Sequence, residues 1–170
     1  MNLNWSRATD PHQIHRLLIE SDRSLSSVMN GTPKRRFEST RKRVEEGAVY
    51  LLESEDEWLG SFTLTTYPVF NQDMVSYFTK LNNPMYLGRT IVNPRLSNME
   101  KCFVTMQCFR KSFKLARGFK SETVRTETRA VNRNFTEIML EVGFRKIYSS
   151  EIDKKMVYLE RRIIDERMMT

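Results

Sequence analysis

The chain has 170 residues, of which 39% are hydrophobic and 29% are charged, as is ordinary for a single compact globular domain. It has no apolar run near the roughly 20 residues of a membrane-spanning helix and no apolar signal core at its start, so we expect a cytoplasmic protein that does not bind membranes. The formal net charge of +7 favours anionic partners, among them phosphorylated cofactors, nucleic acid and acidic proteins.

The first 47 residues predict one strand followed by two helices. Alternation over residues 3–7 indicates a short strand. Asp10-Pro11 predicts the start of a helix that extends towards Asn30-Gly31, because Asp is a good N-cap and Pro suits the first turn. Thr32-Pro33 repeats this start signal and predicts a second helix, rich in Lys and Arg, that ends at Gly47.

Three strands and a long connection are expected next. Residues 48–53 and 58–66 form two β-prone segments separated by an acidic turn. Residues 67–84 lack clear periodicity, and a loop of this length within a compact domain is either functional or contains a short helix. Residues 85–92, M-Y-L-G-R-T-I-V, predict the third strand, which ends at Asn93-Pro94.

A long helix over residues 99–117 is predicted to end at Gly118. It carries both cysteines, Cys102 and Cys108, whose spacing of six residues places them on different sides of the helix and disfavours a disulfide. We therefore expect two free thiols in a reducing compartment. With so few Cys and His residues in the chain, we expect no metal site.

The last part of the chain predicts a strand, a helix and a hairpin. Residues 122–128 indicate the strand, and Asn132 begins a helix that closes on Val142-Gly143-Phe144. Residues 144–150 and 156–161 are expected to pair as a terminal hairpin. We expect one domain over residues 1–161 and a C-terminal tail over residues 162–170.

The segment from Thr126 to Phe144 resembles the last block of the GNAT superfamily of N-acetyltransferases. In those enzymes an Asn follows a strand and begins a helix that closes on Gly-Phe, as Asn132 and Gly143 do here. The expected order β-α-α-β-β-β-α-β-α-β-β over residues 5–161 is also the GNAT order. The resemblance implies one α/β (α+β) domain with a mixed, mostly antiparallel sheet that is splayed in the middle and flanked by helices.

The resemblance also implies transfer of an acetyl or other acyl group from an acyl-CoA to a primary amine of a small molecule or peptide. The block is most similar to that of ribosomal-protein alanine acetyltransferases, where the residue at the position of Glu127 is the general base. The alternative for Glu127 is an ion pair with Arg125 or Arg129. Met139 stands where the family has a proton-donating Tyr, and because methionine cannot donate a proton we take Tyr86 as the nearest substitute acid.

The phosphate-binding loop departs from the family pattern R/Q-x-x-G-x-G/A. Ser97, Glu100 and Cys102 stand at its three signature positions, and a carboxylate at a helix N-terminus competes with phosphate. If acetyl-CoA or another acyl-CoA binds, the resemblance implies the following contacts: the backbone of Thr90, Ile91 and Val92 with the pantetheine, Asn98 and Lys101 with the phosphates, and Asn132 with the pantetheine side.

Two alternatives stay open. The first is a catalytically inactive GNAT-fold module for binding or assembly, which would explain both departures and would use the basic helices on nucleic acid or an acidic protein. The second is an acyltransferase that takes its acyl group from acyl-carrier protein. Relatives of that kind tolerate a poor loop, some carry an Arg in the preceding strand as Arg89 does here, and an acidic carrier suits a basic chain. The alternative for Arg89, which we favour, is an ion pair with a strand neighbour such as Glu127.

Overall fold

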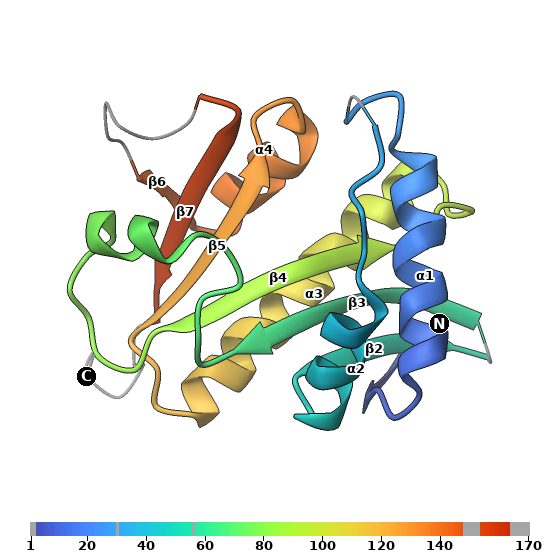
Figure 1. Cartoon of the computed structure of the whole chain (residues 1–170), viewed down its shortest axis with the longest axis horizontal. Coiled ribbons are helices and arrows are strands. Elements are labelled where there is room, and N and C mark those ends of the chain that lie inside the picture. The colour runs from blue at the N-terminus through green and yellow to red at the C-terminus, as the bar shows by residue number, and fades with distance from the viewer. Residues whose placement is uncertain (1–2, 30, 56, 148–153, 164–170) are drawn as a thin grey trace. The chain divides into compact units, whose positions relative to one another are not determined.

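The computed structural model describes residues 3–29, 31–55, 57–147 and 154–163 (Figure 1). Within these residues the strands form one seven-stranded sheet in the order β1-β2-β3-β4-β5-β7-β6. β4 and β5 are parallel, whereas the pairs β1–β2, β2–β3, β5–β7 and β6–β7 are antiparallel. The prediction of an α/β domain with a mixed sheet flanked by helices is therefore confirmed.

The order of the elements agrees with the order expected from the sequence, with one short helix added. The elements are β1 (Asn4–Arg7), α1 (Pro11–Ser24), α2 (Phe37–Glu45), β2 (Val49–Ser54), β3 (Glu57–Thr65), the 3-10 helix η1 (Gln72–Tyr77), β4 (Met85–Val92), α3 (Asn98–Gly118), β5 (Thr123–Arg129), α4 (Arg133–Glu141), β6 (Arg145–Ile147) and β7 (Met156–Arg162). None of these helices is long and apolar enough to cross a membrane.

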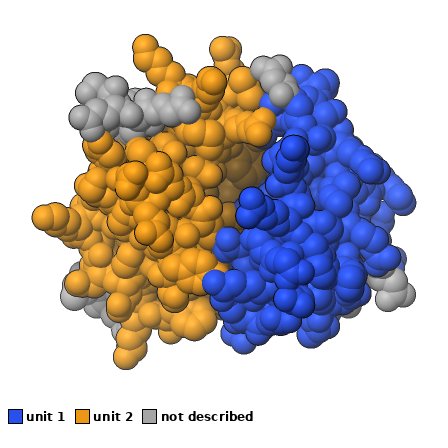
Figure 2. All heavy atoms as spheres, viewed as in Figure 1, with its two compact units in different colours: residues 1–64, 89–108 blue, residues 65–88, 109–170 orange. Residues whose placement is uncertain are grey.

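The chain divides into two compact units, which Figure 2 shows in separate colours. Unit 1 comprises Met1–Leu64 and Arg89–Cys108, and unit 2 comprises Thr65–Gly88 and Phe109–Thr170. The boundaries fall within β4 and α3, so each of these elements contributes residues to both units. β4 and β5 pair at Met85↔Val124 and Tyr86↔Arg125, both in unit 2. The expected splaying of the sheet stays a prediction.

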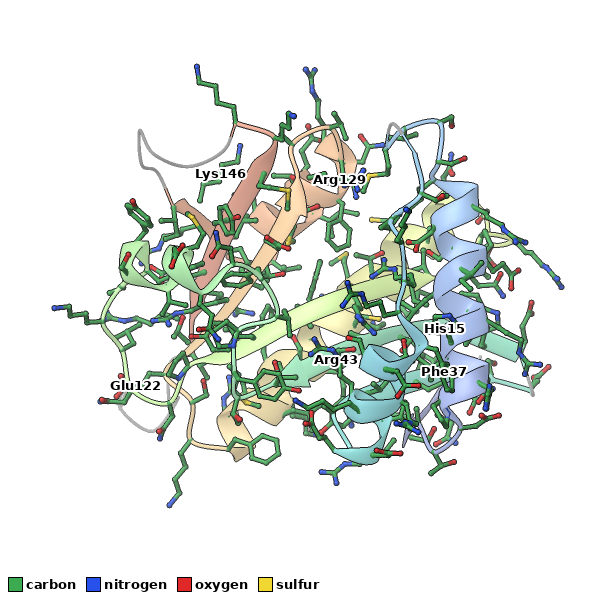
Figure 3. All side chains as sticks on the ribbon, in the orientation of Figure 1. His15, Phe37, Arg43, Glu122, Arg129 and Lys146 are labelled. Carbon is green, nitrogen blue, oxygen red and sulfur yellow. The ribbon has the colours of Figure 1, made fainter. Side chains whose placement is uncertain are left out.

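Unit 1 has an aliphatic core between the helices α1 and α2 and residues of the strands β2 and β4. The side chain of Asp10 accepts a hydrogen bond from the His12 backbone N–H at 2.9 Å, so the predicted N-cap is confirmed. Leu18, at 1% exposure, is among the most buried residues of this core. Between the two helices, the rings of His15 and Phe37 lie edge to face with centroids 5.4 Å apart (Figure 3).

The expected bounds of the first two helices were wrong. α1 ends at Ser24 rather than near Asn30, and α2 begins at Phe37 rather than at Pro33. Arg35 explains part of the difference, because its Nε and Nη2 donate to the two carboxylate oxygens of Asp22 at 2.7 and 2.9 Å. This pair ties the segment before α2 to α1, and a run of cations would in any case be unfavourable at a helix N-terminus.

β3 is buried on both faces, although its sequence alternates between large and small residues. Gly60 of β3 packs closely against α3. A Cβ atom at this position would be 2.6 Å from Val104 Cγ1 and 3.2 Å from Cys108 Sγ. Glycine is therefore required for the strand and the helix to pack at this distance.

Unit 2 has an aromatic core around the rings of Phe109, Phe113 and Phe144, and Met139 of α4 is fully buried. A second cluster joins η1 and the segment after it to β7 through Met74, Phe78 and Tyr158. Residues 67–84, expected either to be functional or to contain a short helix, do contain one, η1.

The terminal hairpin is present as β6 and β7, paired from Arg145↔Glu160 to Ile147↔Tyr158. Residues 148–150 of its expected first strand lie outside the described residues, as do 164–170 of the expected tail. β7 ends at Arg162, so the domain boundary placed after residue 161 stays a prediction.

Candidate functional site

Glu127 is a half-buried carboxylate near the middle of β5 in unit 2. The register of β5 and β7 places it directly opposite Tyr158, whose hydroxyl donates a hydrogen bond to it. Burial raises the pKa of Glu127 above the ordinary carboxyl value, although the hydrogen bond from Tyr158 acts in the opposite direction. A carboxylate with a raised pKa holds a proton more strongly and is a better general base near neutral pH.

Arg125, which the sequence offered as an ion-pair partner for Glu127, makes other contacts. Its guanidinium Nη1 donates to the hydroxyl of Tyr86 at 3.0 Å and its Nη2 donates to the carbonyl of Thr79 at 2.8 Å. The side chain is buried, with 4% of the residue exposed. This finding removes one of the two structural partners expected for Glu127.

Tyr86, the expected substitute acid, is buried in β4 and lies opposite Arg125 in the parallel register. Its ring packs edge to face on Phe70, with centroids 5.6 Å apart. Because Arg125 donates to the Tyr86 oxygen, the phenolic proton of Tyr86 is still available to a further acceptor. The structure therefore places Tyr86 in contact with Arg125, which lies two residues before Glu127 on β5.

Asn132 is the N-cap residue of α4, as expected for the residue that begins this helix. Its side chain makes no capping hydrogen bond, whereas its backbone carbonyl accepts from Thr136 N at 3.1 Å. The amide side chain is therefore not used to close the helix. This arrangement is compatible with the expected contact to a ligand.

The expected pantetheine segment, Thr90, Ile91 and Val92, belongs to unit 1. Ile91 is buried in the core of that unit, and its two neighbours are half-buried. Arg89, just before this segment, has a positive φ of 51°, which is unusual for a non-glycine residue. Its guanidinium donates to Ser39 Oγ at 2.9 Å and to Thr40 Oγ1 at 3.1 Å, and these contacts hold the irregular point of β4 against α2.

The N-terminus of α3 forms a capping box from its own side chains. Ser97 N donates to Glu100 Oε2 at 2.8 Å, and Glu100 N donates to Ser97 Oγ at 3.3 Å. These hydrogen bonds lower the pKa of Glu100, so its carboxylate stays charged at neutral pH.

Two of the N–H groups that a phosphate would use are therefore already taken, and a negative charge lies beside them. Among the expected phosphate contacts, Asn98 is exposed and Lys101 is half-buried. This end of α3 does not fit a pyrophosphate in the arrangement observed.

The sequence reasoning missed Tyr158 and the polar environment of Arg125. Neither is visible without the register of β5 against β7, because the predicted terminal hairpin paired β7 only with β6. It also missed a cavity of about 370 Å³ in unit 2, which Lys80 and Arg125 help to line. The only signal in the sequence was the aromatic content of residues 67–84.

The two cysteines are both free, and they differ in environment. Cys102 is exposed, whereas Cys108 is fully buried and burial raises the pKa of its thiol to about 12. In the described part of the chain no three His, Cys, Asp or Glu side chains are grouped so that they could hold a metal ion.

No protein-family model matches the sequence, and no curated protein matches it either. Among solved structures, it resembles a GNAT-family acetyltransferase from Listeria monocytogenes at 19% identity and a TM-score of 0.70, with 94% of each chain covered. A GNAT-family acetyltransferase from Streptococcus agalactiae gives 13% identity and a TM-score of 0.70, with 96% of each chain covered. The acetyltransferase yncA from Salmonella typhimurium, solved with acetyl-CoA, gives 11% identity and a TM-score of 0.63, covering 98% of this chain and 96% of that one. The chain therefore has the GNAT fold.

Proposed function

We propose that this chain is an N-acyltransferase that moves an acetyl or other acyl group from an acyl-CoA to a primary amine of a small molecule or peptide. The observation that carries the proposal is the half-buried Glu127, whose pKa is raised, on β5 of a GNAT-fold sheet. The structural neighbours support it, since they are acetyltransferases and yncA was solved with acetyl-CoA.

Glu127 would act as the general base in this reaction. An alkylammonium ion has no lone pair on nitrogen, so it must lose a proton before it can attack a carbonyl carbon. The hydrogen bond from Tyr158 fixes the Glu127 carboxylate in one orientation, and burial makes the carboxylate more basic. A bound acyl thioester supplies the electrophilic carbonyl and a thiolate leaving group. Tyr86 is the proposed proton donor, and Asn132 is the proposed donor-orienting residue.

The donor would contact the backbone of Thr90, Ile91 and Val92, with Asn98 and Lys101 near its phosphates. The capping box of Glu100 opposes the second part of this arrangement, because its carboxylate would have to leave Ser97 N. We therefore infer that this chain binds the phosphate end of an acyl-CoA weakly. The proposal covers an acetyl or other acyl group as the group transferred and a primary amine as the acceptor.

The deciding experiment replaces Glu127 with Gln, which keeps the size of the side chain and removes the base. Thiol release from acetyl-CoA and longer acyl-CoAs should be measured with a panel of primary amines. Turnover should fall by roughly 10²–10⁴-fold near neutral pH and recover as pH rises, because free amine becomes abundant. Glu137→Gln, at an exposed position of α4, is the matched control. A Glu127→Gln protein as active as the parent would remove Glu127 from the mechanism.

The second candidate is a GNAT-fold module without catalysis, and the capping box at α3 favours it. In that case no amine and acyl-thioester pair would turn over. Acetyl-CoA would also leave the melting temperature unchanged, because only a ligand that binds the native state raises it. The carrier-protein and nucleic-acid hypotheses gain no support from the structural neighbours.

A further inference from the structure

The cavity of about 370 Å³ in unit 2 lies beside the first half of β5. One wall comes from η1 and the segment after it, with Ser76 and Phe78, and another comes from the approach to β4, with Lys80 and Asn82. Arg125 of β5 also lines it. The volume is within the range of small-molecule sites.

Arg125 is a buried cation whose two identified hydrogen-bond partners are both neutral. They are the Tyr86 hydroxyl and the Thr79 carbonyl, and the guanidinium also lies over the ring of Phe78 at 5.1 Å from its centroid. Its Nε is buried and has no acceptor in the part of the chain that the structure describes. A buried donor left without an acceptor is costly, and a buried charge is normally paired.

The carboxylate opposite Arg125 is already engaged. Glu160 faces Arg125 in the β5–β7 register, but it accepts hydrogen bonds from the backbone N–H of Thr79 at 3.2 Å and from the Thr79 hydroxyl. Arg145 Nη2 lies 3.8 Å from the same carboxylate. Lys80 adds an exposed ammonium group at the cavity wall, so the cavity presents two cations.

Asn82, another residue that lines the cavity, is hydrogen-bonded to the start of β5. Asn82 donates through its backbone N and its Nδ2 to the carboxylate of Glu122, the residue before β5, at 2.7 and 3.1 Å. These two bonds tie the approach to β4 to the start of β5.

We propose that this cavity binds a carboxylate carried by the acceptor amine. The planar edge of a guanidinium matches a carboxylate, and Arg35 binds Asp22 in this way elsewhere in the chain, through Nε and Nη2. Glu127 lies on the same face of β5 two residues after Arg125, about 7 Å along the strand. The proposed ligand would extend from Arg125 along the strand to Glu127, which lies outside the residues that line the cavity. This inference rests on the proposed acyl transfer for the role of Glu127.

The binding test compares γ-aminobutyrate with butylamine, which has the same chain length and amine but no carboxylate. Isothermal titration of the whole chain should show γ-aminobutyrate binding at least about tenfold more tightly than butylamine. A hydrogen bond to a charged group changes a dissociation constant by about that factor or more. Aminopropylphosphonate carries a tetrahedral phosphonate in place of the planar carboxylate. If it binds as tightly as γ-aminobutyrate, the assignment of a carboxylate to the cavity is overturned.

Three variants test the residues. Lys80→Met should weaken γ-aminobutyrate binding and leave butylamine unchanged. Arg125→Lys, which keeps a cation and removes Nε, should weaken γ-aminobutyrate by roughly 10- to 100-fold. The matched control is Lys114→Met, which removes an exposed ammonium from α3 outside the cavity and should change neither ligand. If Arg125→Lys does not fold, Lys80→Met decides the question.

Turnover separates this inference from the proposed function. In acyl transfer, Lys80→Met should raise KM for γ-aminobutyrate with little change in kcat, and should leave KM for butylamine unmoved. Binding of γ-aminobutyrate that depends on Lys80 and Arg125, without turnover of any amine, upholds the cavity and overturns the acyl transfer. Equal binding of both amines, or binding that neither variant alters, overturns the cavity and leaves acyl transfer to the Glu127→Gln experiment.

Discussion

Glu127 and Arg125 lie two residues apart on β5, and the strand turns both side chains to the same face. Their surroundings differ. Glu127 is half-buried against Tyr158, and burial raises its pKa, whereas Arg125 is almost fully buried between neutral partners. At this scale the structure shows a carboxylate and a cation on the same face of one strand. We assign this pair to the amine and the carboxylate of one ligand.

The raised pKa of Glu127 has a consequence for stability. The native state binds this proton more strongly than the unfolded chain does, so the contribution of Glu127 to stability falls as pH rises from the ordinary carboxyl value through the raised one. Above that window Glu127 is a charged group in a partly desolvated place. Glu127→Gln should therefore melt at a higher temperature than the parent at neutral pH, and the difference should shrink in acid.

Thermal melting at several pH values measures this difference directly. Glu137→Gln on the exposed face of α4 should show no such pH-dependent gain over the parent. A constant difference between Glu127→Gln and the parent across the acid range would mean that the carboxylate of Glu127 is not desolvated.

At the scale of single elements, the backbone N–H groups of Ser97 and Glu100 at the N-terminus of α3 are capped by side chains of the same segment. Glu100 supplies the negative charge that an anion would otherwise bring. Glu100→Gln should keep an acceptor for Ser97 N while removing that charge. Calorimetry should then show acetyl-CoA binding roughly two- to fivefold more tightly. Lys101→Glu should have the opposite effect.

Glu141→Gln, which removes the same charge from the end of α4, controls for a general change in net charge. If neither Glu100→Gln nor Lys101→Glu alters the affinity, then the phosphates of the donor do not approach this end of α3.

β3 requires a glycine at position 60, where the strand packs against α3. Gly60→Ala would place a Cβ atom 2.6 Å from Val104 Cγ1, and Val104 has little rotamer freedom within a helix. The substitution should destabilise the fold by about 1–3 kcal/mol, read as a lower midpoint in urea. Gly118→Ala is the control, because a Cβ there meets nothing within 4 Å and alanine favours the helix. Equal midpoints for the two variants would mean that β3 and α3 can separate at little cost.

At the scale of the whole molecule, local signals in the sequence predicted most of the elements. Pro11 after the N-cap Asp10, Gly118 at the end of α3 and Asn132 before α4 each mark a boundary that the structure confirms to within a residue. The predicted start of α2 was wrong. Thr32-Pro33 is a good start signal locally, but Arg35 is bound to Asp22, 13 residues earlier. A long-range contact overrode a local preference there.

The site was predicted less fully than the fold, for a related reason. Glu127 came from a resemblance of one segment, and its burial and its contact with Tyr158 depend on which strand lies beside β5. The environment of Arg125 depends on the path of residues 79–82, a segment without periodicity. Strand register and loop path are fixed by tertiary packing, and one sequence read alone does not contain them.

The exposed thiol of Cys102 on α3 provides one attachment point for a covalent label, because the other thiol, that of Cys108, is buried. A thiolate, not a thiol, attacks an alkylating reagent, so the buried Cys108, with a thiol pKa of about 12, should stay unmodified in the native protein while the exposed Cys102 reacts. Mass spectrometry should find one maleimide dye on the native chain and two on the unfolded chain. A fluorophore would then sit within two turns of the helix end where the donor phosphates are expected. Donor binding there could be followed as a change in emission, without any engineered cysteine.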